Sequence, residues 1–179
     1  VGEEAYYDDS NGILRSAEST HRMTVPMEEL NREKKYTVCY RKIIERKPYF
    51  TETEEEVRID FDFRPVQGPD AKAYHIADAH NHVEEPVAAA ENFIKKYGPI
   101  DFLILNGDIP DHSGRIENFI NIYEIVDRLT HGNIPTVFSR GNHDTRGVFA
   151  EKIADHTPCQ DGRSYYSFRL GNIWGLVLD

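Results

Sequence analysis

The chain of 179 residues has the composition of an ordinary soluble globular protein, with 39% hydrophobic and 29% charged residues. No apolar run approaches the roughly 20 residues that a membrane-spanning helix requires. The net charge of -10 argues against a broad basic surface that would bind duplex nucleic acid. Two cysteines, Cys39 and Cys159, are too few for a disulfide framework, so we expect free thiols. The sequence identifies neither a cellular compartment nor an oligomeric state.

The first part of the chain, residues 1–68, is rich in strand-forming side chains. Near-alternating runs of Val, Ile, Tyr, Phe and Thr occupy residues 21–27, 34–44 and 56–63. These runs predict an antiparallel sheet or part of a sandwich, with too few strands for a complete sandwich. Turn-forming residues at 65–70 then predict a linker to a second domain at residues 71–179.

From residue 71 onward, strand-like and helix-like patterns alternate. Continuous apolar runs predict strands at residues 73–79, 100–107 and 134–141. Helical periodicity and helix-ending glycines predict helices at residues 87–98, 114–132 and 148–155. Residues 164–179 predict two more strands joined by a turn at 170–172. This alternation predicts an α/β fold with a parallel sheet covered on both faces.

A polar cluster directly follows each of the first three predicted strands of this second domain. The clusters are Asp78-Ala-His80, Gly107-Asp108-Ile-Pro-Asp111 and Gly141-Asn142-His143-Asp144. In an open α/β sheet the parallel strands deliver their C-terminal ends to one edge, where ligands bind. We therefore expect three clusters that are distant in sequence to converge in space.

The side chains of these clusters are suited to divalent metal ions. The candidate metal ligands are Asp78, His80, Asp108 and Asn142, whose oxygen and imidazole donors suit Mn, Fe or Zn. A carboxylate such as Asp108 can bridge two cations about 3.5–4 Å apart, an arrangement used for in-line attack of hydroxide on phosphorus. His143 has the properties of a general acid for the leaving oxygen, and we expect Asp144 to hold its imidazole.

Each cluster taken alone has a common structural explanation. An Asp at a strand end often caps the following helix, the Gly-Asp-Ile-Pro-Asp run is an acceptable β-turn, and the Gly-Asn-His-Asp run is acceptable as a turn with a left-handed Asn. A structural role does not explain why all three follow strands in one domain. Their joint occurrence therefore favours a shared site.

The three clusters, in this order, resemble the first three signature blocks of the calcineurin-like metallophosphoesterase family. Residues 71–179 are similar to the N-terminal half of its catalytic domain, a layered sheet with helices. The run at residues 140–147 resembles bacterial members with purple-acid-phosphatase-like architecture, whose fibronectin-like β domain would correspond to residues 1–68. The resemblance implies a first metal on Asp78 and His80, Asp108 bridging, a second metal on Asn142, and His143 near the leaving group with support from Asp144.

The sequence also departs from the family pattern. Purple acid phosphatases have a metal-binding Tyr where this chain has Asp111, and the related protein Ser/Thr phosphatases have Arg where it has His112. The later Gly-His and Gly-His-x-His blocks, which supply further ligands, do not occur. We therefore expect this polypeptide to be a fragment of a longer enzyme that binds metal weakly and turns over slowly. Arg146 and His112 are candidate substrate contacts, although each also suits a solvated loop.

We expect metal-dependent hydrolysis of a phosphomonoester or phosphodiester, with a phosphorylated small molecule or a nucleotide as substrate. An amidohydrolase using His80 and His82 as its paired histidines is a second hypothesis, but it leaves the other two clusters unexplained. A third hypothesis is a non-catalytic interaction protein with a vestigial metal half-site. Turnover that depends on Mn separates the enzymes from the binding protein.

Overall fold

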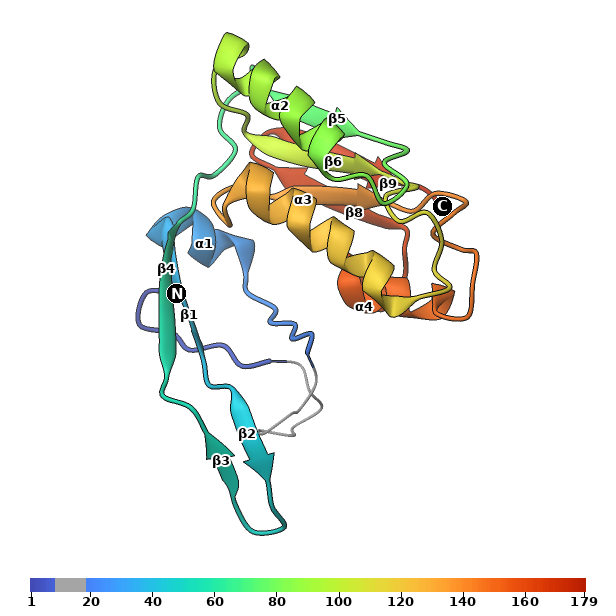
Figure 1. The fold of residues 1–179 in the computed structure, drawn as a ribbon. Helices are drawn as coiled ribbons and strands as arrows, with labels where there is room; N and C mark the ends of the chain where they lie inside the picture. The colour runs from blue at the N-terminus through green and yellow to red at the C-terminus, as the bar shows by residue number, and fades with distance from the viewer. Residues whose placement is uncertain (9–18) are drawn as a thin grey trace. The chain divides into compact units, whose positions relative to one another are not determined.

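The computed structural model describes residues 1–8 and 19–179, which form two compact units, Val1–Phe63 and Arg64–Asp179 (Figure 1). Residues 9–18 of the predicted β-rich segment lie outside the described residues. Within the described residues, no helix combines the length and apolar character that crossing a membrane requires.

The unit Val1–Phe63 contains paired strands. Two antiparallel pairs are described: β1 (Lys35–Tyr40) with β4 (Val57–Asp62), and β2 (Ile43–Arg46) with β3 (Thr51–Thr53). Tyr36 and Phe61, opposite each other on β1 and β4, stack with ring centroids 4.8 Å apart. Aromatic pairs of this kind stabilise two-stranded sheets. The assignment of residues 1–68 to a fibronectin-like domain stays a prediction.

The strand predicted at residues 21–27 is wrong. Residues 21–26 have no regular structure, and helix α1 (Met27–Glu33) begins where the strand would end. Helix formers fill this segment, and Glu28 and Glu29 in its first turn interact favourably with the helix dipole. Lys34, in the left-handed conformation, ends the helix. Pro26, which cannot donate a ladder hydrogen bond, interrupts the alternating run, and the helix begins at the next residue.

The unit Arg64–Asp179 is built on a parallel sheet. Its strands lie in the order β5 (Ala73–Ile76), β6 (Phe102–Asn106) and β7 (Thr136–Ser139). The connections are α2 (Glu84–Tyr97) from β5 to β6, then the 3₁₀ helix η1 (Ile116–Phe119) and α3 (Ile120–Thr130) from β6 to β7 (Figure 1). The predicted α/β class is confirmed, and the C-terminal ends of all three strands reach one edge of the sheet.

All three predicted helices differ from the observed ones in their limits, and the helix predicted at 114–132 is observed as η1 and α3, residues 116–130. Helix α2 begins three residues before the predicted start, because Pro86 is tolerated in a first helical turn. The helix predicted at 148–155 is instead the short 3₁₀ helix η2 (Ala150–Lys152) followed by α4 (Ile153–His156).

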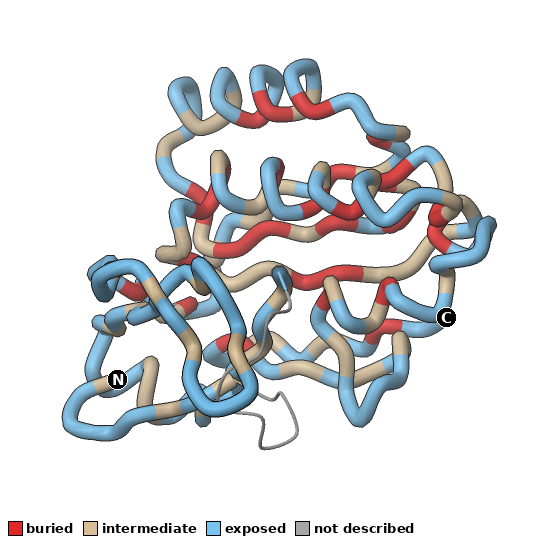
Figure 2. Tube along the Cα trace, turned by 60° about the horizontal axis from the view of Figure 1, so that its bottom comes forward, coloured by how far each residue is buried: buried red, intermediate tan, exposed pale blue. Residues whose placement is uncertain are grey.

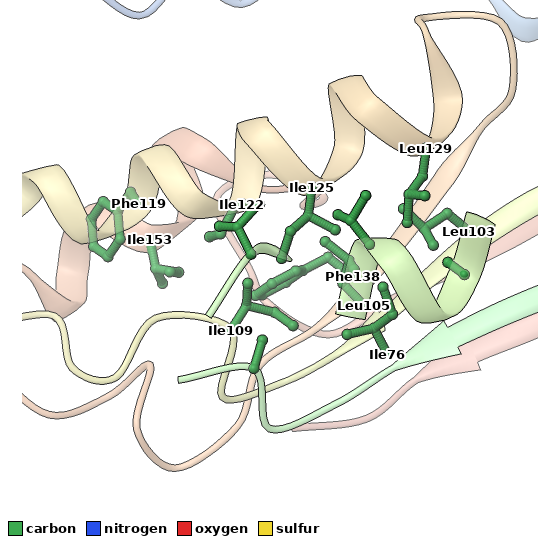
Figure 3. Close-up of a cluster of buried hydrophobic side chains, with 14 residues drawn as sticks. Ile76, Leu103, Leu105, Ile109, Phe119, Ile122, Ile125, Leu129, Phe138 and Ile153 are labelled. Atoms are coloured by element: carbon green, nitrogen blue, oxygen red, sulfur yellow. The ribbon is translucent and has the colours of Figure 1, made fainter. Parts of the chain in front are cut away.

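One face of the sheet is covered by α2 and α3. Figure 3 shows side chains of α3, among them Ile122 and Ile125, pointing toward Leu105 and Phe138 of the strands. Leu105 and Ile125 are completely buried, and Figure 2 shows buried residues concentrated along the strands and on the helix sides that face them. Because both helices pack on one face, the loops at the strand ends are held by a common core.

The other face of the sheet is covered by a β-hairpin. Strands β8 (Tyr166–Leu170) and β9 (Ile173–Val177) pair antiparallel and pack in a second apolar cluster with Phe102 and Val137. Gly171, with φ of 59°, forms the turn that joins them. The predicted cover on both faces is therefore present, with helices on one side and a hairpin on the other.

A Tyr166→Phe variant is expected to lose about 1–2 kcal/mol of unfolding free energy. The Tyr166 hydroxyl donates to the carbonyl of Phe138 at 2.8 Å and accepts from its amide at 3.0 Å, so both backbone groups would lose their partner. Urea denaturation followed by circular dichroism measures the change. The matched control is Tyr165→Phe, because Tyr165 is 51% exposed and its hydroxyl should contribute little. Equal effects of the two substitutions would contradict the prediction.

Candidate metal centre

The loop after β5 is joined to the loop after β6 by main-chain hydrogen bonds. Three amides of the first loop donate to carbonyls of the second: Asp78 to Gly107 at 3.1 Å, His80 to Asp108 at 3.0 Å and Asn81 to Ile109 at 2.9 Å. The two loops thus run alongside each other beyond the end of the sheet. This pairing brings the first two predicted clusters together.

Several non-glycine residues of these loops adopt left-handed backbone conformations. Their φ angles are 56° for Asp78, 45° for His80, 66° for Asn81 and 54° for Asp108. Such conformations cost on the order of 1 kcal/mol or more each, and persist where the surrounding structure imposes them, often at functional sites. The concentration of strained residues marks this edge of the sheet as a candidate site.

The loop after β7 closes on the same place. The amide of His143 donates to Oδ1 of Asp108 at 2.7 Å. Gly107 and Gly141 allow the close approach, because a Cβ on Gly107 would lie 2.6 Å from the Gly141 nitrogen. All three polar clusters therefore converge at one edge of the sheet.

Three side chains in this convergence could hold a metal ion. Donor atoms of His80, Asp108 and His143 all lie within 4.8 Å of one another, and the two imidazole rings meet edge to face with centroids 4.5 Å apart. Nδ1 of His80 is buried without a hydrogen-bond partner, and a buried polar atom in that state is costly unless something binds it. Imidazole and carboxylate donors with one such nitrogen fit a divalent transition metal.

The observed group only partly matches the predicted ligands. His80 and Asp108 belong to both sets, whereas His143 was predicted to act in proton transfer. Oδ1 of Asp78 lies 3.9 Å from Nε2 of His80, so Asp78 borders the group. Asn142 precedes His143 in the same loop and is exposed. The assignment of Asp78 and Asn142 as ligands thus stays a prediction.

The imidazole of His143 has partners on both nitrogens. Nδ1 donates to the carbonyl of Asp111 at 2.5 Å, which leaves Nε2 to accept from Nη1 of Arg146 at 3.0 Å. The carboxylate of Asp111 is 3.8 Å from Nδ1. His112, the other predicted substrate contact, instead accepts through its Nδ1 from the Gly114 amide at 2.9 Å.

Asp144 does not hold the imidazole, contrary to the sequence-based expectation. This carboxylate is completely buried, and its Oδ2 accepts from the amides of Gly141 at 2.6 Å and Asp108 at 3.0 Å. Its Oδ1 has no hydrogen-bond partner. Burial raises the pKa of Asp144, and the two amide donors oppose that rise. Asp144 therefore joins two site loops, and the carbonyl of Asp111 orients His143.

Three contact residues were not assigned a role from the sequence. Asp111 was noted only as a departure from the family pattern, although its place in the second cluster is a usable signal. Oδ1 of Asn81 accepts from the Asp111 amide at 3.1 Å. The Ser113 hydroxyl donates to the Asp144 carbonyl at 2.6 Å. Asn81 and Ser113 form hydrogen bonds to backbone groups, and contacts of this kind cannot be predicted from sequence spacing.

An ion pair anchors the start of the loop after β7. Arg140 binds Asp179 through two guanidinium nitrogens, one of them Nε at 3.2 Å from Oδ1, and the Ser164 hydroxyl donates to the same carboxylate. The Ser164 hydrogen bond, followed by Arg140, lowers the pKa of Asp179. Arg140 directly precedes Gly141, so this contact fixes the entry to the third cluster.

Comparisons with known proteins found one matching family model and similar solved structures. The family model described as calcineurin-like phosphoesterase matches residues 71–176. Among solved structures, the chain is similar to purple acid phosphatase PPD1 from yellow lupin (Lupinus luteus) seeds, with a TM-score of 0.50 and 16% sequence identity. That match covers 76% of this chain and 28% of the lupin chain, and at this identity it shows the fold alone. No curated protein matches the sequence significantly.

Proposed function

Because the chain belongs to the calcineurin-like phosphoesterase family, we propose that it serves in metal-dependent hydrolysis of phosphate monoesters or diesters of small molecules or nucleotides. The observation that carries the proposal is the convergence of His80, Asp108 and His143 after three different strands. Family membership alone indicates the general chemistry. The group of His80, Asp108 and His143 indicates where in the fold this chemistry would take place.

We propose that the site holds two divalent ions, Mn, Fe or Zn, with Asp108 shared between them. The proposed ligands are Asp78, His80, Asp108 and Asn142. Such ions, when bound, acidify water and neutralise the oxygens of a phosphoryl group. The buried Nδ1 of His80, which has no hydrogen-bond partner and lies 3.7 Å from Oδ1 of Asp111, supports its role as a ligand, because a cation in the site would compensate for that atom's lost hydration.

His143 and Arg146 are proposed to act on the substrate. Both ring nitrogens of His143 already have partners, which supports a role in proton transfer over a role as a metal ligand. A phosphate oxygen that takes the Arg146 donor would free Nε2, which would take up a proton from solvent and donate that proton to the leaving alcohol oxygen. Asp111 keeps the ring oriented during this step. We place His112 at the edge of the substrate site.

We further propose that residues outside this sequence complete the metal site. The chain spans 28% of the length of the lupin structure that it resembles, which supports the idea of additional ligands elsewhere. On this view the 179 residues bind metal weakly and turn over slowly on their own. Weak binding is still measurable by calorimetry.

The direct test is calorimetric titration of the protein with MnCl₂, followed by titration of inorganic phosphate with and without Mn²⁺. We expect saturable metal binding, phosphate binding only with metal present, and slow Mn²⁺-dependent hydrolysis of an aryl phosphate. If the protein does not bind Mn²⁺, or if it binds phosphate equally well with and without Mn²⁺, the proposal is rejected. Either result would favour the non-catalytic interaction protein.

An Arg146→Ala variant is expected to bind phosphate about tenfold more weakly in the presence of Mn²⁺, the loss typical of one charge-assisted hydrogen bond. Nη1 of Arg146 lies 3.0 Å from Nε2 of His143, and we propose that a phosphate oxygen of the substrate accepts from this guanidinium. The control is Arg163→Ala, because Arg163 is engaged with the Tyr165 ring on another loop. If Arg146→Ala and Arg163→Ala bind phosphate equally well, Arg146 does not contact it.

A further inference from the structure

The η1–α3 segment has a second apolar face that does not contribute to the core. Phe119, Ile122 and Ile125 pack into the core (Figure 3). Ile116 and Ile120, however, are 37% and 57% exposed. Tyr123 is 41% exposed. Ile120 lies four residues after Ile116, and Tyr123 lies three residues after Ile120. Residues at these spacings share one side of a helix, so the three form an outward apolar row.

Two more exposed apolar residues lie on a segment that is bonded to Ser113, three residues before the start of this row. The segment from Arg146 to Phe149 is bonded at both ends to Ser113, whose amide donates to the Arg146 carbonyl at 2.8 Å and whose carbonyl accepts from the Phe149 amide at 2.9 Å. Val148 is 84% and Phe149 is 36% exposed. We name the set formed by Ile116, Ile120, Tyr123, Val148 and Phe149 the apolar strip.

The apolar strip is linked to the candidate metal centre through Arg146. Arg146 is separated from Val148 of the strip by Gly147 alone, and its guanidinium contacts His143. Ile116 follows Ser113, which is bonded to the Arg146–Phe149 segment, by three residues, and Tyr123 lies about 10 Å further along the helix axis. An ester whose phosphate lies at Arg146 would have its alcohol portion next to these side chains.

We propose that the apolar strip binds the alcohol portion of the substrate and that this portion is an apolar aryl or alkyl group. The inference rests on the proposed function and adds its substrate class. Apolar contact gains free energy in proportion to the area removed from water, and five exposed apolar side chains offer that area. Exposed Glu117 and Glu124 flank the row and disfavour a leaving group that carries further negative charge, such as a nucleoside diphosphate.

The test measures binding of non-hydrolysable phosphonates to the Mn²⁺-loaded protein by calorimetry. Methylphosphonate reports on the phosphate site, and hexylphosphonate and benzylphosphonate add an apolar group. Since a fully buried methylene strengthens binding by up to about fourfold, partial contact should make both larger ligands at least about tenfold tighter than methylphosphonate. An Ile120→Ser/Val148→Ser variant should reduce this ratio to about one while methylphosphonate affinity stays unchanged.

The control variant is Leu176→Ser, because Leu176 is also exposed, at 68%, but lies on β9. It should keep the full ratio. As a second measurement on the unmodified protein, methyl NMR signals of Ile116, Ile120 and Val148 should shift with hexylphosphonate and stay in place with methylphosphonate.

The outcomes separate this inference from the proposed function. Equal affinities for all three phosphonates, or a full ratio retained in Ile120→Ser/Val148→Ser, would overturn the apolar strip as a substrate contact and leave the phosphate site standing. Failure of every phosphonate to bind would overturn both proposals. A dimer that disappears in the variant, together with equal phosphonate affinities, would assign the strip to a second copy of the chain and overturn its substrate role.

Discussion

An Asp108→Asn variant is expected to bind Mn²⁺ at least about 100-fold more weakly than the unmodified protein, since even groups that only support a metal ligand contribute about 10–100-fold. Asp108 offers a carboxylate between His80 and His143 and is the ligand proposed to serve both cations. Asparagine keeps the volume and an oxygen that can accept the His143 amide, so the loops should stay in place. The loss should therefore come from the missing charge.

The matched control is Asp101→Asn. Oδ2 of Asp101 accepts the Lys72 amide at 2.7 Å, the same distance as the bond from the His143 amide to Asp108, but at the opposite end of β6. This substitution should leave Mn²⁺ affinity unchanged. Calorimetric titration measures the Mn²⁺ affinity of the two variants, and thermal melts check that both are folded. Unchanged affinity in Asp108→Asn would remove Asp108 from the metal site.

The second large effect is expected from Gly141→Ala, which should cost about 3 kcal/mol or more of unfolding free energy and also prevent metal binding. A Cβ at this position would lie 2.7 Å from the Asp108 nitrogen and 2.9 Å from its carboxyl carbon. The Asp108 amide cannot move away freely, because it donates to the buried carboxylate of Asp144. The clash would therefore displace the loops that carry the proposed metal ligands.

A Gly68→Ala variant distinguishes this crowding from ordinary backbone strain. Gly68 has φ of 79°, and an added Cβ would meet no atom within 4 Å, so the cost there should be only about 1 kcal/mol. It should leave metal binding intact. Urea denaturation and Mn²⁺ titration of both variants make the comparison. If Gly141→Ala lowers the free energy of unfolding less than Gly68→Ala does, the prediction is wrong. The loops after β6 and β7 would then be able to move apart with little loss of stability.

Much of the second unit was predictable because its strands are continuous apolar runs separated by periodic helices. The β5–β6–β7 order and the edge at which the polar clusters meet follow from general rules of parallel sheets. The first unit was harder to predict because short alternating patterns are ambiguous. The run at residues 21–27 alternates but contains Pro26, and it precedes α1 without forming a strand.

The site was predictable in its location but not in its detailed contacts. Asp108, His80 and His143 are conspicuous together, because each lies within a few residues of the end of a different strand of one sheet. The partner of His143 was predicted incorrectly, because adjacency in sequence favoured Asp144 while the folded backbone presents the carbonyl of Asp111. Main-chain acceptors have no sequence signature, so a contact of this kind requires the fold.

The hydrogen bonds between the loops after β5 and β6 are made by amides and carbonyls rather than by side chains. Exchanging the residue at position 78, 80 or 108 therefore leaves the course of these loops largely unaltered. The same scaffold can accommodate different donor combinations, so preference for one metal over another is open to redesign by changing side chains alone. The tightly apposed Gly107 and Gly141 would have to be kept, as would Asp144, whose buried carboxylate accepts the Gly141 and Asp108 amides.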